Sequence, residues 1–430
     1  MAHRTLKKSS YDNLIDRLNR FPQGAPPSET LYQILKVLFS EREAELVSLL
    51  PIRPFTAEKA ARNWKMDLNQ ASKILHELAG RAILVDMEKE GISRYVLPPP
   101  MAGFFEFSLM RLNGKIDQKL LGELFHQYLN VEEDFIRDLF VQGETQLGRI
   151  FVNEAVLSED NALHVLDYER ASEVIRTASH IGVGICYCRH KMEHMGKNCD
   201  APMDICMTFN NSAASLTKHG YARKIDAMEC LDLLDQAYSH NLVQFGENIQ
   251  QGVNFICNCC SCCCEAMVAA RKYGFMQPVH TSNFLPEINR ESCSGCGKCV
   301  NVCPVEALGL FSASDPRDRK KKTAKVDENI CLGCGVCVRV CHHNSISLKG
   351  RDKRVITPVD STHRTVLMAI ERGKLQNLIF DNQILFSHRA LAALLGVLLK
   401  LPPAKQILAQ EQVKSRYLAR VIRWYNKRNI

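Results

Sequence analysis

A cysteine pattern that occurs twice between residues 293 and 341 constrains this chain more than any other feature. The first copy begins at Cys293 and reads CSGCGKCVNVCP, and the second begins at Cys331 and reads CLGCGVCVRVC. Each of the four cysteine positions recurs 38 residues later. Cysteines at every third position of a tight loop present their thiolates around a compact inorganic centre, and the glycines allow the backbone to approach it. The duplication therefore predicts two metal centres of one kind.

The repeat resembles the bacterial two-cluster ferredoxin domain over roughly residues 280 to 350. The resemblance implies two [4Fe-4S] clusters, each completed by a cysteine from the other half of the repeat. One cluster then takes Cys293, Cys296, Cys299 and Cys341, and the other takes Cys331, Cys334, Cys337 and Cys303. A pair of zinc sites is the alternative, but the third cysteine step with a trailing cysteine, present twice, argues against it. The chain departs from the ferredoxin pattern at His342, because proline follows only the other trailing cysteine.

A second group of cysteines lies between residues 186 and 264. The segment Val183 to Arg189 predicts a strand with Cys186 and Cys188 on one face. Asp200 and Pro202 predict a helix start that returns Cys206 towards this strand. The charge of four converging thiolates would be offset by the basic residues Arg189, His190, Lys191 and His194.

The run from Cys257 to Cys264 holds six cysteines in eight residues. Phe255 to Cys259 predicts a strand, and Ser261 predicts the cap of a helix whose first turn holds three thiolates, which the helix dipole stabilises. At least one further iron-sulfur cluster is therefore expected, with ligands among Cys186, Cys188, Cys199, Cys206, Cys257, Cys259, Cys260, Cys262, Cys263 and Cys264. Adjacent cysteines do not all fit one cubane, so a cluster of other geometry, unligated thiols and a redox pair stay open.

The chain as a whole predicts a multidomain α+β protein. Its expected parts are a helical, winged-helix-like domain (1–100), a helical connector (101–180), a Cys-rich α/β iron-sulfur domain (181–279), the ferredoxin domain (280–350) and a basic helical C-terminal region (351–430). The first part resembles a winged helix because a helix starting at Thr56 and another over Asp67 to Gly80 precede a hairpin over residues 83–97.

Winged helices usually bind DNA through the second helix. In this chain that helix offers Asn69, Gln70 and Lys73 to bases. The hairpin, however, carries acidic residues that repel phosphate, namely Asp86, Glu88 and Glu90. The sequence therefore favours a winged helix used for protein contact, and no nucleic-acid partner is expected.

The basic charge of the chain belongs to its C-terminal part. From Thr365 onwards there are 11 Lys and Arg against three Asp and Glu, a net charge of +8 that equals the excess of the whole chain. The uncharged stretch 390–399 is too short to span a bilayer. Beyond Pro403, basic residues interrupt an apolar stripe made of Ile407, Val413, Tyr417, Val421 and Trp424. This stripe predicts either peripheral contact with the inner face of a membrane or a helical hairpin packed on protein.

The 19 cysteines, in a chain that opens without an apolar leader, indicate a reducing compartment and a cytoplasmic location. The combination of motifs resembles proteins of anaerobes described as 4Fe-4S dicluster or ferredoxin-type iron-sulfur proteins. That resemblance implies electron transfer as a subunit or partner of an anaerobic oxidoreductase. Since no Gly-rich dinucleotide fingerprint is present, we expect a redox partner that carries any flavin.

Two other functions remain open at this stage. The Cys-rich domain could hold a catalytic cluster that reduces a substrate, with His190 and His194 as proton donors. A redox-sensing transcription regulator is the third interpretation, and the acidic hairpin and the second ferredoxin cluster argue against it. The substrate, the reduction potentials and the oligomeric state have no signature in the sequence.

Overall fold

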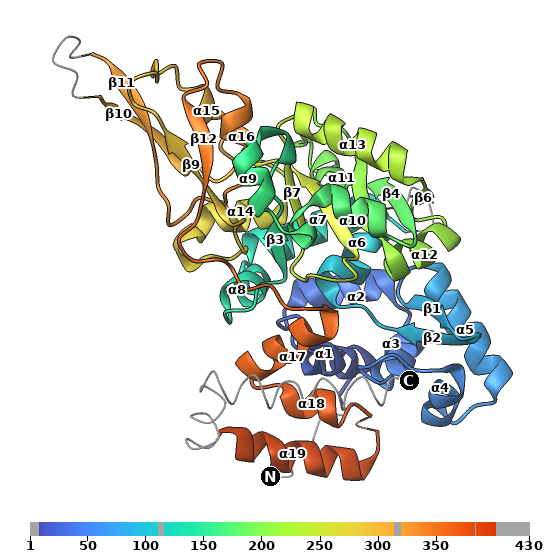
Figure 1. Ribbon diagram of the computed structural model, residues 1–430. Coiled ribbons are helices and arrows are strands. Elements are labelled where there is room, and N and C mark those ends of the chain that lie inside the picture. Colours follow the sequence, from blue (N-terminus) through green and yellow to red (C-terminus); the bar gives the residue numbers. More distant parts are fainter. Residues whose placement is uncertain (1–7, 111–115, 314–319, 383, 401–430) are drawn as a thin grey trace. The chain divides into compact units, whose positions relative to one another are not determined.

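The computed structural model describes residues 8–110, 116–313, 320–382 and 384–400 (Figure 1). The chain divides into two compact units, one made of Met1–Thr145, Lys218–Tyr221 and Thr362–Ile430, and the other of Gln146–Thr217 and Ala222–Ser361. Helices mix with several small sheets, which agrees with the expected multidomain α+β class.

The first unit is mainly helical. Its helices are α1 (Ser10–Arg20), α2 (Glu29–Leu38), α3 (Glu41–Ser48), α4 (Ala57–Trp64), α5 (Leu68–Gly80), α6 (Phe105–Ser108), α7 (Gln118–His126), α8 (Asp134–Val141), α17 (Ser361–Glu371), α18 (Leu375–Ile379) and α19 (Phe386–Lys400). Ser28 and Asp67 cap α2 and α5 as their sequence positions predict, because each side chain accepts a hydrogen bond from the first turn of its helix.

Helices α4 and α5 precede the predicted hairpin of β1 (Val85–Lys89) and β2 (Ile92–Val96), which pair antiparallel. The candidate DNA-contacting side chains Asn69, Gln70 and Lys73 are exposed on α5. Asp86 is not free to repel a ligand, because it is buried and paired with Lys218 at 2.5 Å and His219 at 3.1 Å. Of the hairpin acids, Glu88 and Glu90 are the exposed ones.

The second unit contains a six-stranded sheet in the order β3-β7-β8-β5-β4-β6, in which every neighbouring pair is antiparallel. The strands are β3 (Gly148–Ile150), β4 (Ile181–Ile185), β5 (Asp204–Phe209), β6 (Arg223–Lys224), β7 (Val243–Glu247) and β8 (Phe255–Cys259). The helices of this part are α9 (Glu159–His164), α10 (Ala171–Thr177), α11 (Tyr187–His194), α12 (Asn210–Lys218), α13 (Ala227–Ser239) and α14 (Glu265–Lys272). Segment 101–180, expected to be helical, thus also supplies the edge strand β3.

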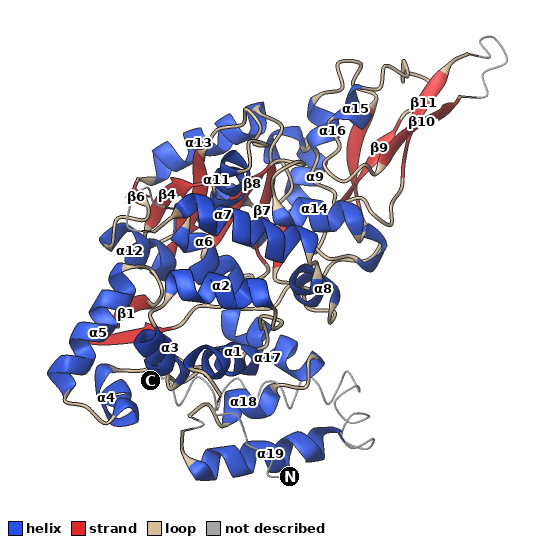
Figure 2. Cartoon of the chain, turned by 180° about the vertical axis from the view of Figure 1, so that it is seen from behind, coloured by secondary structure: helices blue, strands red, loops and turns tan. Residues whose placement is uncertain are grey.

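One face of this sheet carries the apolar core. Val183, Met207 and Ile256 pack there against buried residues of α10 and α13. Figure 2 shows the strands in red, with α11 and α13 beside them. Because side chains alternate along a strand, Cys206, Cys257 and Cys259 lie on the opposite face.

The ferredoxin part of the same unit shows the duplication in its elements. It consists of β9 (Phe284–Ile288), α15 (Lys298–Asn301), β10 (Leu308–Ser312), β11 (Lys322–Val326), α16 (Val336–Arg339) and β12 (Ile346–Gly350). Strand β9 pairs with β12, and β10 pairs with β11, both antiparallel. Each half therefore contributes one short helix that contains its third cysteine, Cys299 in α15 and Cys337 in α16 (orange in Figure 1).

Among the described residues, no helix is both long and apolar enough to cross a membrane. Helix α19 exposes a row of apolar side chains that includes Leu391, Leu394 and Val397. The predicted apolar stripe from Ile407 to Trp424 lies outside the described residues.

Candidate metal centres

The structure gathers the ferredoxin cysteines into two sets of four, each around a hollow. Cys293, Cys296 and Cys299 line one hollow together with Cys341 from the other half of the repeat. A second hollow is lined by Cys303, Cys331, Cys334 and Cys337. These are the groupings that the crosswise pattern predicts, while ligation itself remains a prediction.

Glycines fix the loops around both hollows. Gly295 and Gly333 have φ of +69° in both copies. A Cβ at Gly295 would lie 2.4 Å from the carbonyl oxygen of Lys322, and a Cβ at Gly333 would lie 2.1 Å from that of Phe284. Neither position therefore accepts a side chain, since the backbone is both left-handed and in close contact. The ferredoxin loops need these glycines to reach β11 and β9.

The trailing cysteines have matching environments. The backbone N–H of Ala307 donates to Sγ of Cys303 at 3.2 Å, and that of Ser345 donates to Sγ of Cys341 at 3.3 Å. His342 and His343 are exposed, and His343 lines the first hollow. Each trailing cysteine thus has a backbone N–H within hydrogen-bond distance of its sulfur, four residues further along the chain.

The donor set of these hollows suits a cluster. Each is lined by four cysteines. A cubane attaches its four thiolates to four separate irons. Four cysteine sulfurs at one hollow are therefore the donor set that [4Fe-4S] takes.

Six cysteines of the sheet domain form a closed ring of S–H···S contacts. The order around the ring is Cys186, Cys188, Cys264, Cys259, Cys257, Cys206 and back to Cys186. The Sγ atoms of Cys264 and Cys259 are 3.1 Å apart. Strand pairing explains part of the ring, since Cys206 in β5 pairs with Gly184 in β4, and β8 adjoins the other side of β5.

Three local predictions around this ring are wrong. Strand β4 ends at Ile185 after a register shift, and Cys186 is the N-cap of α11, so Cys186 and Cys188 do not share a strand face. No helix starts at Asp200, because residues 204–209 form β5, whose Ile205, Met207 and Phe209 are buried in the sheet. The predicted strand over Phe255–Cys259 is present. The helix after it starts at Glu265, with Cys264 as N-cap, rather than at Ser261.

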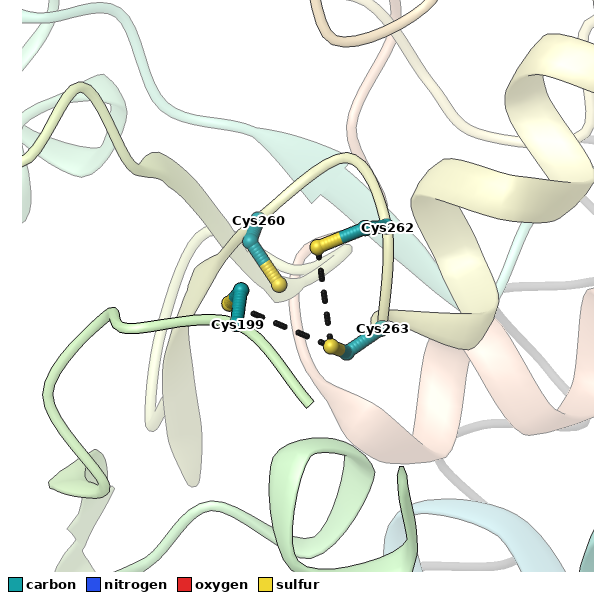
Figure 3. Close-up of side chains that lie close together, drawn as sticks. All are labelled: Cys199, Cys260, Cys262 and Cys263. Carbon is teal, nitrogen blue, oxygen red and sulfur yellow. Dashed lines mark hydrogen bonds between the residues drawn. The ribbon is translucent and has the colours of Figure 1, made fainter. Parts of the chain in front are cut away.

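Four other cysteines of the sheet domain form a separate group (Figure 3). Cys199 lies on the loop before β5, and its three neighbours Cys260, Cys262 and Cys263 lie on the turn between β8 and α14. The Sγ atoms of all four lie within 4.8 Å of one another. Sequence reasoning missed this division, although the alternation along β8 already separates Cys257 and Cys259 from Cys260.

Hydrogen bonds between neighbouring cysteines of the ring shift their pKa values in opposite directions. Hydrogen bonds from Cys206 and Cys259 lower the pKa of Cys257 to about 5, and those from Cys188 and Cys259 lower the pKa of Cys264 to about 6. The donating neighbours have raised pKa values, because each keeps its proton while it donates a hydrogen bond to the adjacent sulfur. Neighbouring sulfurs of the ring thus differ in acidity.

Arg189 lies between the two cysteine groups. Its side chain is fully buried, and its guanidinium donates to the carbonyl oxygens of Pro202 and Asn258, each at 2.8 Å. Burial opposes the charge, but the thiolates of both groups, among them Cys186 and Cys260, raise the pKa of Arg189. It therefore remains charged and offsets thiolate charge, the role expected of the basic residues after Cys188.

The other basic residues of α11 have different positions. Lys191 forms a buried ion pair with Glu265, the residue after Cys264, and so ties α11 to α14. His190 is buried, and its ring centroid is 4.6 Å from that of His194.

Comparison with known proteins agrees with this geometry. Residues 292–345 match the family described as the 4Fe-4S dicluster domain. Together with the cysteine groups, the match makes this chain an iron-sulfur protein. No curated protein matches the chain.

The second half of the dicluster domain packs directly on the sheet domain. The backbone N–H of Asn153, just after β3, donates to the carbonyl oxygen of Cys334 at 3.0 Å. Phe284 and Leu348 share an apolar cluster with Val152 and Val165. The hollow lined by Cys331, Cys334 and Cys337 therefore adjoins the sheet domain.

Helix α14 gives a second connection between the ring and the dicluster domain. Cys264 of the ring caps its start, and Arg271 near its end is 3.7 Å from Glu306, three residues after Cys303. The eight-residue helix is about 12 Å long. In contrast, the first hollow is lined only by dicluster residues, and its Cys296 is exposed.

Proposed function

We propose that this chain is an electron-transfer protein of an anaerobic oxidoreductase system, in which the sheet domain is the end of an internal electron route. A bound [4Fe-4S] cluster supplies one-electron redox chemistry. The observation that carries the proposal is the packing of the second dicluster hollow on the sheet domain through Asn153 and Cys334.

Features of the dicluster domain and the ring support an order for the electron route. The eight dicluster cysteines hold two clusters, and the six-cysteine ring holds a further one. Helix α14 connects the ring to Glu306 of the dicluster domain. The first hollow, in contrast, is lined by an exposed cysteine, Cys296. We therefore propose that the first hollow faces a partner and that the ring is the far end of the route.

The surface near the first hollow favours a partner with an acidic docking face. Lys298, Lys322 and Lys325 are exposed on the dicluster domain, and charge complementarity accelerates association. We propose that this partner carries the flavin or nicotinamide site. Arg317 and Arg319, in the segment between β10 and β11, lie outside the described residues.

An anaerobic potentiometric titration followed by EPR tests this function. The full chain is expected to show the signals of two interacting [4Fe-4S] clusters and a further signal from the ring. In the variant Cys206→Ser/Cys257→Ser the further signal disappears and the dicluster signals persist. If the wild-type chain shows dicluster signals alone, the ring is no redox centre and the route ends within the dicluster domain.

A catalytic role for the ring is the second candidate. The favouring observation is that six cysteines exceed the four ligands of a closed cubane, and His190 and His194 lie on α11, which begins at the ring. Substrate-dependent oxidation of the prereduced chain without a partner would favour this role.

For the first unit we propose protein contact through the winged-helix-like elements α4, α5, β1 and β2. The exposed carboxylates of Glu88 and Glu90 repel phosphate groups. Asp86 adds nothing to this repulsion, because it is paired with Lys218.

We also propose a cytoplasmic location in an anaerobe, which the number of reduced cysteines supports. Contact with the inner membrane face through the basic C-terminal region remains part of the proposal.

A further inference from the structure

The four-cysteine group beside the ring is compact. Its four Sγ atoms lie within 4.8 Å of one another, with Cys262 and Cys263 3.5 Å apart and Cys263 and Cys199 3.9 Å apart. Four thiolates at about 2.3 Å from one ion, arranged as a tetrahedron, have sulfur–sulfur separations of about 3.8 Å. The observed group has the size of a single-ion site.

We propose that Cys199, Cys260, Cys262 and Cys263 bind one soft divalent metal ion, zinc or iron, in a mononuclear site separate from the iron-sulfur clusters. A tetrahedral set of four sulfur ligands is typical of these two metals. The proposal goes beyond electron transfer and does not depend on it.

The surrounding chain holds this geometry in place. Arg189 bonds the carbonyl oxygen of Pro202, on the loop that carries Cys199, and that of Asn258, two residues before Cys260. One buried side chain therefore fixes the separation between the two segments that supply the ligands. Figure 3 shows the four side chains converging from these segments.

Arg189 also compensates part of the negative charge of this site. Four thiolates around a divalent ion leave a net negative charge, which is costly when partly buried. The guanidinium of Arg189 interacts electrostatically with Cys260 as well as with the ring. Sharing one cation between both cysteine groups explains why this arginine is fully buried.

Exposure differs among the four ligands. Cys263 is buried, Cys199 and Cys260 are half-buried, and Cys262 is exposed. The ion is therefore reached by solvent from one side, at Cys262. We expect a chelator to remove it from the folded chain before any buried cluster is lost.

Metal and labile-sulfide analysis of the full chain, purified anaerobically, tests the site. The variant Cys199→Ser/Cys263→Ser is expected to lose about one metal ion per chain and no sulfide, because a mononuclear thiolate site contains no inorganic sulfur. The ring variant Cys206→Ser/Cys257→Ser is expected to lose iron and sulfide together and keep the ion. Cys230→Ala, which removes a buried cysteine of the apolar core, should change neither quantity.

Zinc and iron are distinguished by elemental analysis and by EPR, since oxidised iron in four thiolates is a high-spin ferric centre and zinc gives no signal. Either metal supports the site. Loss of sulfide in parallel with metal in Cys199→Ser/Cys263→Ser, or loss of neither, would overturn it. If that variant does not fold, Cys262→Ser and chelator treatment of the wild-type chain decide: release of metal with unchanged sulfide supports the site, and release of both or neither refutes it.

Discussion

At the scale of single residues, the dicluster domain depends on glycines that tolerate no side chain. Gly333→Ala would place Cβ against the carbonyl oxygen of Phe284 at a left-handed backbone position. We expect it to destabilise the domain by about 2 kcal/mol or more and to lower iron content at the second hollow. Gly350→Ala, where a Cβ meets nothing within 4 Å, is the matched control. Anaerobic denaturation and iron analysis measure both variants, and equal behaviour would contradict the close contact.

Arg189 gives a second prediction at this scale. Arg189→Met removes a buried cation that faces thiolates of both cysteine groups. Leaving buried charge without its partner costs about 3–5 kcal/mol, so we expect a comparable loss of unfolding free energy and loss of metal from the sheet domain alone. Arg176→Met on exposed α10 surface should change stability by less than about 0.5 kcal/mol. A stable Arg189→Met chain with full metal content would disprove this role.

At the scale of elements, the start of α14 separates two kinds of cysteine. Single substitutions Cys262→Ser, Cys263→Ser and Cys264→Ser should each leave both dicluster EPR signals intact and reducible by an artificial donor. Turnover with the redox partner should be lost for Cys264→Ser, because Cys264 belongs to the ring, and should fall less for Cys262→Ser and Cys263→Ser, whose sulfurs lie outside it. Turnover is measured with the assembled system. Full turnover in all three variants would make this turn structural and the protein a plain electron carrier.

Helix α5 carries the prediction about DNA. The full chain should bind DNA weakly and without sequence preference, because Glu88 and Glu90 lie exposed on the adjoining hairpin. Fluorescence anisotropy over a range of salt concentrations measures this. Sequence-selective, salt-sensitive binding that Asn69→Ala and Lys73→Ala abolish would instead support a regulator.

At the scale of the whole molecule, the two iron-sulfur parts differ in how much their sequence reveals. The dicluster domain has its ligands at fixed local spacing, so the two sets of four follow from the motif. The sheet domain assembles its cysteines from strands and loops up to 78 residues apart, between Cys186 and Cys264. The local sequence pattern predicted β8 correctly. It put Cys188 on a strand and Cys206 on a helix, whereas sheet pairing and the bulge at Gly184 decide the positions of both residues.

The same contrast applies to charge. The basic residues after Cys188 were expected to offset thiolates, and Arg189 does so. Lys191 instead pairs with Glu265. No spacing rule relates residues 74 positions apart, so this pairing needed the fold.

The central claim, that the sheet domain holds iron-sulfur chemistry beyond the dicluster domain, is tested most directly by counting iron and sulfide in the full chain purified without oxygen. We predict more than about eight irons per chain, the content of two [4Fe-4S] clusters, and a fall to about that number when Cys186 and Cys188 are replaced by serine. An iron content of about eight that these replacements leave unchanged would contradict the claim.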